Sequence, residues 1–139
     1  MEYLTKTNDY IGISEPEYAP GSFLRTGKKS FLVFNRNKYM TVLTENIAFF
    51  YVKFNRTVFT TFDKQEYGVI YSLEQVQQLL PEQQFFRLNR QYLMNFAAIK
   101  EVELFLARKL LVVPTVSFPE KLLVSKEKAR GFLRWMEER

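Results

Sequence analysis

Five hydrogen-bonding side chains interrupt an otherwise apolar stretch, FFRLNRQYLMNF, at residues 85–96. Arginine can form two parallel hydrogen bonds with guanine, and asparagine or glutamine can do the same with adenine, so these residue types can read base edges in a DNA major groove. An ordinary buried strand carries few such side chains. The stretch is therefore a candidate recognition segment, and its polar members are Arg87, Asn89, Arg90, Gln91 and Asn95.

Strict alternation along this stretch would place an arginine on each face of a strand, so one continuous strand is not expected. We predict instead a turn centred on Asn89, Arg90 and Gln91 between two buried segments, which would push these three side chains outward together. Arg87 and Asn95 have a simpler explanation. We expect Arg87 to be an ion-pair or capping residue and Asn95 to satisfy a loop.

The chain contains no cysteine and no histidine. The first absence excludes disulfides, thiolate metal sites and cysteine nucleophiles, and the second removes the commonest general base and the commonest metal ligand. Glu101 and Glu103 could form a carboxylate pair, but two residues apart on an expected strand they more simply line one wet face. We therefore expect no enzyme, no metal site and no cofactor.

The charge of the chain is unevenly distributed. The formal net charge is +5, and residues 1–27 carry two cations and four anions, which leaves +7 for residues 28–139. Such an excess on a small domain indicates a polyanionic partner. No apolar run is long enough to cross a membrane, and the first residues, MEYLTKTNDY, lack the order of a signal peptide, so we expect a soluble, cytoplasmic protein with no membrane partner.

Two regions are expected along the 139 residues. Residues 1–27 contain two prolines and three glycines without sustained periodicity, which is typical of a linker or a partly ordered arm. Residues 28–139 have a length that suits one domain with its own core. We predict the folded domain there.

Strands dominate the predicted domain, because β-branched and aromatic residues recur between short polar turns. The alternation in RTVFTTF, residues 56–62, indicates a strand with one wet face. We expect antiparallel strands at residues 30–35, 38–44, 46–54, 56–62, 66–71, 98–106, 109–113 and 122–124.

Two helices are expected. Ser72 and Gln75 have the spacing of a capping box and Pro81 ends the first helix, which we expect to cover a sheet. Ser125 is the expected N-cap of the second, whose predicted apolar face comprises Ala129, Phe132, Leu133 and Met136. Lysines in the first turn of that helix oppose its dipole, and a bound anion would reverse the penalty.

The ordered set of motifs resembles the LytTR-type DNA-binding domain, an effector domain of response regulators. The segments ENIAFFYVKFNRTVFTTFDKQEY, SLEQVQQLLPEQQ, FFRLNRQYLMNFAAIKEV and LLVSKEKARGFLRWM follow one another in the family's order, and the resemblance covers residues 31–136. Residues of the third segment that match the family pattern are Phe86, Arg87, Asn89, Arg90, Tyr92, Asn95 and Ile99.

The resemblance implies a mostly β fold, an elongated stack of small antiparallel sheets with one short sheet-capping helix and a C-terminal helix. It also implies that loops from one edge enter successive major grooves of double-stranded DNA without a recognition helix. By this resemblance Arg90 falls on a position that reads a base edge. The candidates for base contact are Arg90, Asn89, Asn55 and Arg56, and those for phosphate contact are Lys53, Gln91, Lys126 and Lys128. The first loop is short, so Asn55 and Arg56 could contact either a base or a phosphate.

The chain departs from the family pattern at three positions. Asn89 stands where histidine is frequent and Lys126 where arginine is frequent, and lysine lacks the two-pronged donor geometry of arginine. Glu127 lies close to a position that can carry a base-contacting arginine, and a carboxylate there would repel phosphate. We therefore expect Arg90 to contribute more to specificity than the loop at residues 125–128.

The function implied by the resemblance is sequence-specific DNA binding that regulates transcription. The chain would act as the output domain of a two-component-type regulator or as a stand-alone member, as a homodimer on repeated half-sites; a receiver domain or sensor partner would lie outside this chain. The alternative is a β-rich protein-interaction module with a basic surface, in which residues 56–62 form an edge strand that accepts a partner strand.

Overall fold

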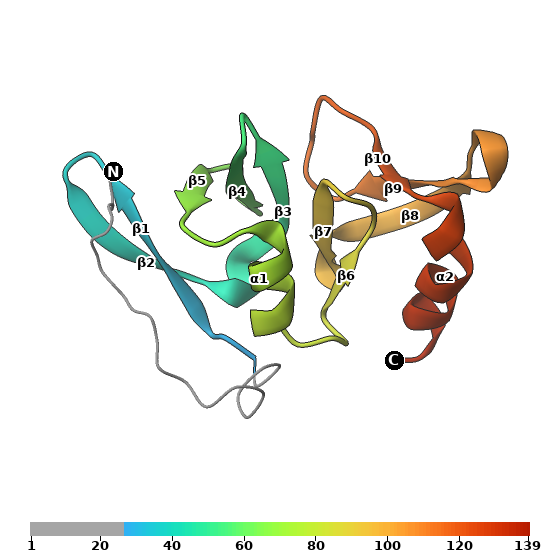
Figure 1. Ribbon diagram of the computed structural model, residues 1–139, viewed down its shortest axis with the longest axis horizontal. Coiled ribbons are helices and arrows are strands. Elements are labelled where there is room, and N and C mark those ends of the chain that lie inside the picture. The colour runs from blue at the N-terminus through green and yellow to red at the C-terminus, as the bar shows by residue number, and fades with distance from the viewer. Residues whose placement is uncertain (1–26) are drawn as a thin grey trace.

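Residues 27–139, which the computed structural model describes, form three antiparallel sheets arranged along the long axis of the molecule (Figure 1). The first sheet is the hairpin of β1 (Ser30–Asn35) and β2 (Lys38–Leu43). The central sheet has the order β5 (Glu66–Val69), β4 (Arg56–Thr61), β3 (Ile47–Lys53), β7 (Tyr92–Asn95), β6 (Phe85–Arg87). The third has the order β10 (Leu122–Val124), β9 (Leu110–Pro114), β8 (Ile99–Leu104).

The fold confirms the predicted class, including the two helices, α1 (Leu73–Leu79) and α2 (Ala129–Glu137). The predicted strands agree with the observed ones to within two residues at each end. The predicted arm, residues 1–27, lies outside the described residues except for Gly27 and stays a prediction. None of the helices in residues 27–139 is of a length and apolarity that would let it span a membrane.

The central sheet is buried on both of its faces. On one face Phe50, Phe59 and Leu93 pack with α1 and with the inner side of the β1–β2 hairpin. On the other face Phe49 and Met94 pack with the third sheet and with α2. Successive side chains of a strand point to opposite faces, so β3, β4, β6 and β7 each contribute to both cores.

Burial on both faces contradicts the wet face predicted for residues 56–62. In β4 the side chains of Thr57, Thr60 and Thr61 are buried, although the alternation of the segment predicted one face in contact with water. β4 is hydrogen-bonded to β3 on one side and β5 on the other, so it is not an edge strand. The partner-strand site predicted there in the alternative hypothesis is therefore wrong.

Helix α1 begins and ends where the sequence predicted. The hydroxyl of Ser72 accepts from the Gln75 backbone N–H (3.1 Å), and the Gln75 side chain accepts from the Ser72 N–H (2.9 Å). The helix ends at Leu79, ahead of Pro81. Val76 is fully buried against the hairpin side of the central sheet, so α1 covers that sheet as expected.

Helix α2 differs from its prediction in two respects. A single 3-10 turn, Lys126–Lys128, precedes the helix, and the Ser125 side chain makes no capping hydrogen bond. Leu133 is 49% exposed, whereas Trp135 packs against Phe86, Phe96 and Phe132. The predicted apolar face was therefore wrong at Leu133.

The Trp135 indole N–H donates to the Glu82 carbonyl (2.8 Å), which ties the helix to the chain ahead of β6.

Candidate nucleic-acid interface

Three loops lie side by side at one edge of the molecule, and backbone hydrogen bonds connect them in order. The first loop is residues 53–56, the second residues 88–91 and the third residues 125–128. The Val52 N–H donates to the Gln91 carbonyl (3.2 Å), and the Ser125 N–H donates to the Leu88 carbonyl (3.1 Å). Figure 1 shows the tip of β3 and β4 and the loop between β6 and β7 on the same side of the molecule.

Arg87 supports the second loop from beneath. Its Nε donates to the Asn89 carbonyl (2.8 Å), its Nη2 to the Arg90 carbonyl (2.8 Å) and its Nη1 to the Gln77 side chain (3.1 Å). The guanidinium therefore fixes two successive peptide groups of the loop to α1. Of the two roles predicted for Arg87, ion pairing and capping, the structure shows the second, since its guanidinium caps two loop carbonyls.

The Asn89 side chain is occupied within the protein. Its Oδ1 accepts from the Gln91 N–H (2.7 Å), and its Nδ2 donates to the Leu123 carbonyl of β10. A side-chain amide offers two N–H donors and two acceptor lone pairs, so one of each remains available. Asn89 thus closes the second loop and joins it to the start of the third, and only half of its hydrogen-bonding capacity is left for a base.

Arg90 has a held backbone and a free side chain. Its carbonyl accepts from Arg87, while its exposed guanidinium makes no hydrogen bond or ion pair with any residue in the range 27–139. Gln91 is exposed as well, and only its backbone is engaged. The predicted turn centred on these residues between two buried segments is confirmed, with β6 and β7 on its two sides.

Asn95 lies at the other end of β7 and is fully buried. Its Oδ1 accepts from the Ala97 N–H (2.9 Å) and from the Gln84 side chain (2.6 Å), and its Nδ2 donates to the Ile47 carbonyl (2.8 Å). These bonds satisfy the chain turn after β7, as predicted. Asn95 is therefore a structural residue, remote from the exposed edge of the second loop.

The first loop is a two-residue turn with an apolar tip. Phe54 and Asn55 both have positive φ angles, 52° and 61°, which suit the twist of a tight hairpin but are unusual for residues other than glycine and asparagine. The Phe54 side chain is 89% exposed. No packing within the described residues explains this phenylalanine, which the resemblance places in the first loop but which was not among the predicted candidates for DNA contact. The predicted strands left only Asn55 between them, whereas the observed turn holds both Phe54 and Asn55.

The cations beside that tip lie against the central sheet. Lys53 Nζ is 3.0 Å from Glu66 Oε2 on β5, and Glu66 also accepts from the Tyr51 hydroxyl (2.9 Å). The Arg56 guanidinium lies over Gly68, where any Cβ would collide with it. Asn55 makes no side-chain hydrogen bond with a described residue. At the tip itself only Phe54 and Asn55 are therefore unengaged.

The third loop adds cations next to the second. Lys126 and Lys128 are exposed, and the Lys128 N–H donates to the Ser125 carbonyl (3.0 Å). Partial burial lowers the pKa of Lys128, and the nearby charge of Arg87 lowers it further. A phosphate group near Lys128 and Arg87 would relieve the repulsion between these two cations.

The protein-family comparison decides what this edge belongs to. The family model of the LytTr DNA-binding domain matches residues 37–137, which contain all three loops. The chain belongs to this family. The resemblance found in the sequence is thereby confirmed, and the chain is a DNA-binding domain.

A solved LytTr structure shares the fold. It is the LytTr DNA-binding domain of a protein from Bacillus cereus described as a methyl-accepting/DNA response regulator. Its TM-score is 0.68 and its sequence identity is 21%, over 79% of this chain and 98% of that domain. No curated protein matches the chain in sequence. The specific contacts of this LytTr domain therefore have to be argued from its own loops.

Proposed function

We propose that this LytTr domain binds double-stranded DNA sequence-specifically and regulates transcription, with the three loops reaching into successive major grooves. Arg90 on the second loop contacts a base edge. Asn55 and Arg56 on the first loop are secondary candidates for base contact. Lys53, Gln91, Lys126 and Lys128 contact phosphates on either side.

The observation that supports this proposal best is the combination of rigid backbone and free guanidinium at Arg90. Recognition of a base requires a donor held in a defined position, because flexible donors lose entropy when they bind. Arg87 and Asn89 hold the peptide groups on both sides of Arg90, while its own side chain has no partner among residues 27–139. We assign Asn89 chiefly to positioning, with its one free N–H and lone pair available to a neighbouring base.

The other candidates differ in how far they must move. Arg56 would have to leave Gly68 to reach a base edge, and Lys53 would have to exchange Glu66 for a phosphate. Lys126 and Lys128 are exposed and free of ion pairs with other described residues. We therefore propose phosphate contacts first at the third loop and next at Lys53.

A salt titration of DNA affinity tests whether the domain binds DNA through phosphate contacts. If about six phosphates are neutralised, the logarithm of the affinity should fall with the logarithm of the salt concentration with a slope near −5. Binding sites would first be selected from random duplexes with the full chain. A slope near zero, or no enrichment of any sequence, would contradict the proposal.

Arg90→Ala tests the assigned reader. We expect a loss of about 1–3 kcal/mol in affinity and a relaxed preference at one base pair, with an unchanged unfolding midpoint. Arg134→Ala on the exposed side of α2 is the matched control and should alter neither quantity. Unchanged base preference in Arg90→Ala would favour the protein-interaction alternative.

The regulatory setting is part of the proposal. A DNA-binding domain that reads short half-sites gains affinity when two copies bind adjacent sites, which supports a homodimer on repeated half-sites. If a receiver domain or sensor partner controls this chain, it would act by changing how two copies are arranged for binding to DNA.

A further inference from the structure

The hairpin at the far end of the molecule from α2 is a sheet of two strands, and its strand β2 has an outer edge that pairs with no described strand. The Thr44 N–H donates to the Lys29 carbonyl (2.9 Å), which sets the alternation of bonded pairs along the hairpin. By that alternation Tyr39, Thr41 and Leu43 point their backbone N–H and C=O groups away from β1. No strand within residues 27–139 pairs with this side of β2.

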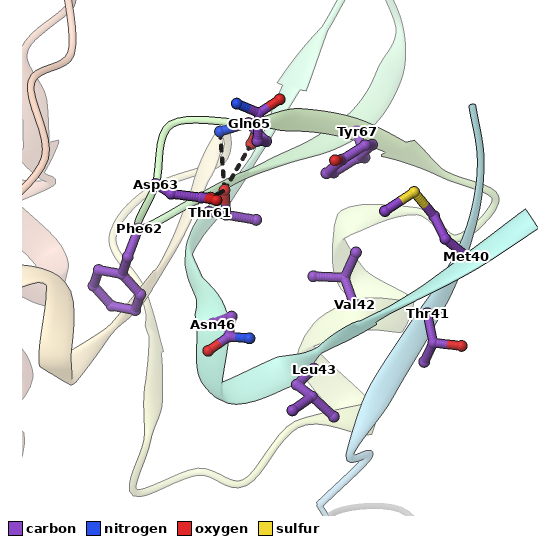
Figure 2. A pocket seen from close by; sticks show the side chains of 10 residues that line it. All are labelled: Met40, Thr41, Val42, Leu43, Asn46, Thr61, Phe62, Asp63, Gln65 and Tyr67. Carbon is purple, nitrogen blue, oxygen red and sulfur yellow. Dashed lines mark hydrogen bonds between the residues drawn. The ribbon is translucent and has the colours of Figure 1, made fainter. Parts of the chain in front are cut away.

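A hollow of about 570 Å³ lies along this edge (Figure 2). Met40 and Val42 from the inner face of β2 and Thr41 and Leu43 from its outer face all line it. Figure 2 shows the chain around Thr61, Gln65 and Tyr67 on the opposite side of the hollow. The edge is therefore not covered by another element of the described chain, and space is left beside it.

The strand also lacks the features that usually protect an edge. Free edges are commonly blunted by proline, by a bulge or by a charge in the middle of the strand. β2, with the sequence KYMTVL, has a charge only at its first residue, and its pairing with β1 is regular. Tyr39 and Leu43 are 62% and 47% exposed, so two large apolar side chains flank the open backbone groups.

The sequence of β2 is complementary to itself in the antiparallel direction. When two copies of the strand pair about Thr41, Tyr39 of one copy lies opposite Leu43 of the other. At these positions the free backbone N–H and C=O groups of the two copies point toward each other, as in the hydrogen-bonded pairs of an antiparallel sheet. This register therefore satisfies the backbone groups at all three positions. Side chains of directly opposed residues lie on the same face and close enough to touch, so the Tyr39 ring of one copy would contact Leu43 of the other.

Charges at the two ends of the strand fit the same register. Glu45 follows β2 and would lie beside Arg36 in the turn of the second copy and Lys38 at the start of its β2. Within one chain Lys38 and Glu45 are seven residues apart along an extended strand, about 23 Å, so they cannot pair with each other. Both are exposed and have no ion pair with a described residue.

From these observations we infer that the open edge of β2 binds a second copy of this chain, two-fold symmetrically about Thr41, to form a four-stranded sheet. The interface consists of backbone hydrogen bonds, Tyr39–Leu43 contacts and Glu45 beside Arg36 and Lys38. It lies on the opposite side of the central sheet from α2, and it does not depend on DNA.

Sedimentation velocity of the full chain without DNA, over a range of concentrations, tests the inference. We expect a reversible monomer–dimer equilibrium. Thr41→Pro should abolish the dimer, because it removes the central N–H of each copy, while proline at an outward-facing edge position leaves the pairing with β1 intact. Thr41→Val keeps the backbone donor and should leave the dimer unchanged. A chain that stays monomeric at all concentrations, or a Thr41→Pro variant that still dimerises, would overturn the inference.

A charge exchange tests the register independently of the proline variant. Glu45→Lys and Lys38→Glu should each weaken the dimer about tenfold, since each replaces two attractive pairs by repulsive ones. The double variant should return to within about twofold of the original chain. Restoration can arise only between copies, because the two residues are too far apart in one chain. A double variant as weak as the single ones would overturn the proposed register.

Discussion

The first and second loops reach the same edge of the domain by different means. The second loop is held by side chains, since Arg87 and Asn89 bind its peptide groups and connect it to α1 and β10. The first loop is held by its backbone, because a two-residue turn between β3 and β4 fixes the path through positive φ angles at Phe54 and Asn55. One loop therefore depends on particular side chains and the other on the handedness of a turn.

Because of this difference, the two loops have different roles in DNA recognition. In the second loop the polar groups of Arg87 and Asn89 are used to build the loop, and Arg90 and Gln91 keep free side chains, of which only Arg90 carries a charge. In the first loop the backbone needs no side-chain support, so the tip can present an apolar ring. Apolar side chains in a major groove contact the methyl group of thymine, a feature that hydrogen-bonding side chains do not read.

The largest expected effect comes from removing the support of the second loop. Arg87→Ala eliminates three charge-assisted hydrogen bonds and should lower the free energy of unfolding by about 2–4 kcal/mol while also abolishing specific DNA binding. Urea unfolding and DNA anisotropy would measure the two effects. Arg90→Ala is the comparison, because it should affect DNA binding alone. Equal stability of the two variants would show that the second loop does not depend on Arg87.

The first loop should respond in the opposite way. Phe54→Gly relieves a backbone conformation that is unfavourable for L-residues, so we expect unchanged or slightly higher stability. DNA affinity should nevertheless fall by about 1 kcal/mol, through loss of the ring contact. Replacing each thymine of the selected site by deoxyuridine, which lacks the methyl group, should locate the contact. A Phe54→Gly variant that binds DNA as well as the original chain would remove Phe54 from the interface.

A smaller effect is expected from the carboxylate that holds Lys53. Glu66→Gln leaves an acceptor for the Tyr51 hydroxyl but removes the charge, so Lys53 becomes available to phosphate. DNA affinity should rise by about 0.5 kcal/mol at low salt, equally for specific and random duplexes. Glu103→Gln, on exposed β8, is the control. A fall in affinity would mean that Glu66 positions Lys53 productively.

The smallest effect appears only in alkali. Burial and the hydrogen bond to Glu66 raise the pKa of Tyr51 from 10 to about 12, so the unfolded chain ionises first. The stability that Tyr51 contributes is therefore complete below pH 10 and is lost as the pH rises towards 12. Tyr51→Phe should lose less stability over this interval in urea unfolding. An identical pH dependence in both proteins would contradict the assignment.

The sequence allowed most of the fold and the second loop to be predicted, because both have local signals. Alternation, turn residues and the Ser72–Gln75 box act over a few residues, and the polar cluster around Arg90 interrupts an apolar stretch. Burial of Thr57 and Thr60 could not be read locally, since it depends on segments from elsewhere in the chain that pack on both faces of β4, the hairpin on the Phe59 side and the third sheet on the Val58 side. On α2, Trp135 packs in the core in place of the predicted Leu133 for the same reason, because its partners Phe86 and Phe96 come from elsewhere in the chain.

The site itself was predictable by position but less so by role. Asn89 and Arg90 are adjacent polar residues of one loop, and only the location of the Leu123 carbonyl distinguishes a residue that holds the loop from one that projects from it. Phe54 was not among the predicted DNA contacts, because phenylalanine in a strand-rich sequence suggests a core residue. Its exposure follows from the length of the turn and not from its chemistry.

Burial of the central sheet on both faces also bears on cooperativity. Phe50 and Phe49 are neighbours on one strand but belong to different cores, so exposing either core weakens the strand on which the other is built. The hairpin layer and the α2 layer should therefore melt together as one unit. Loops that project from such a sheet should therefore keep their geometry until the whole domain unfolds.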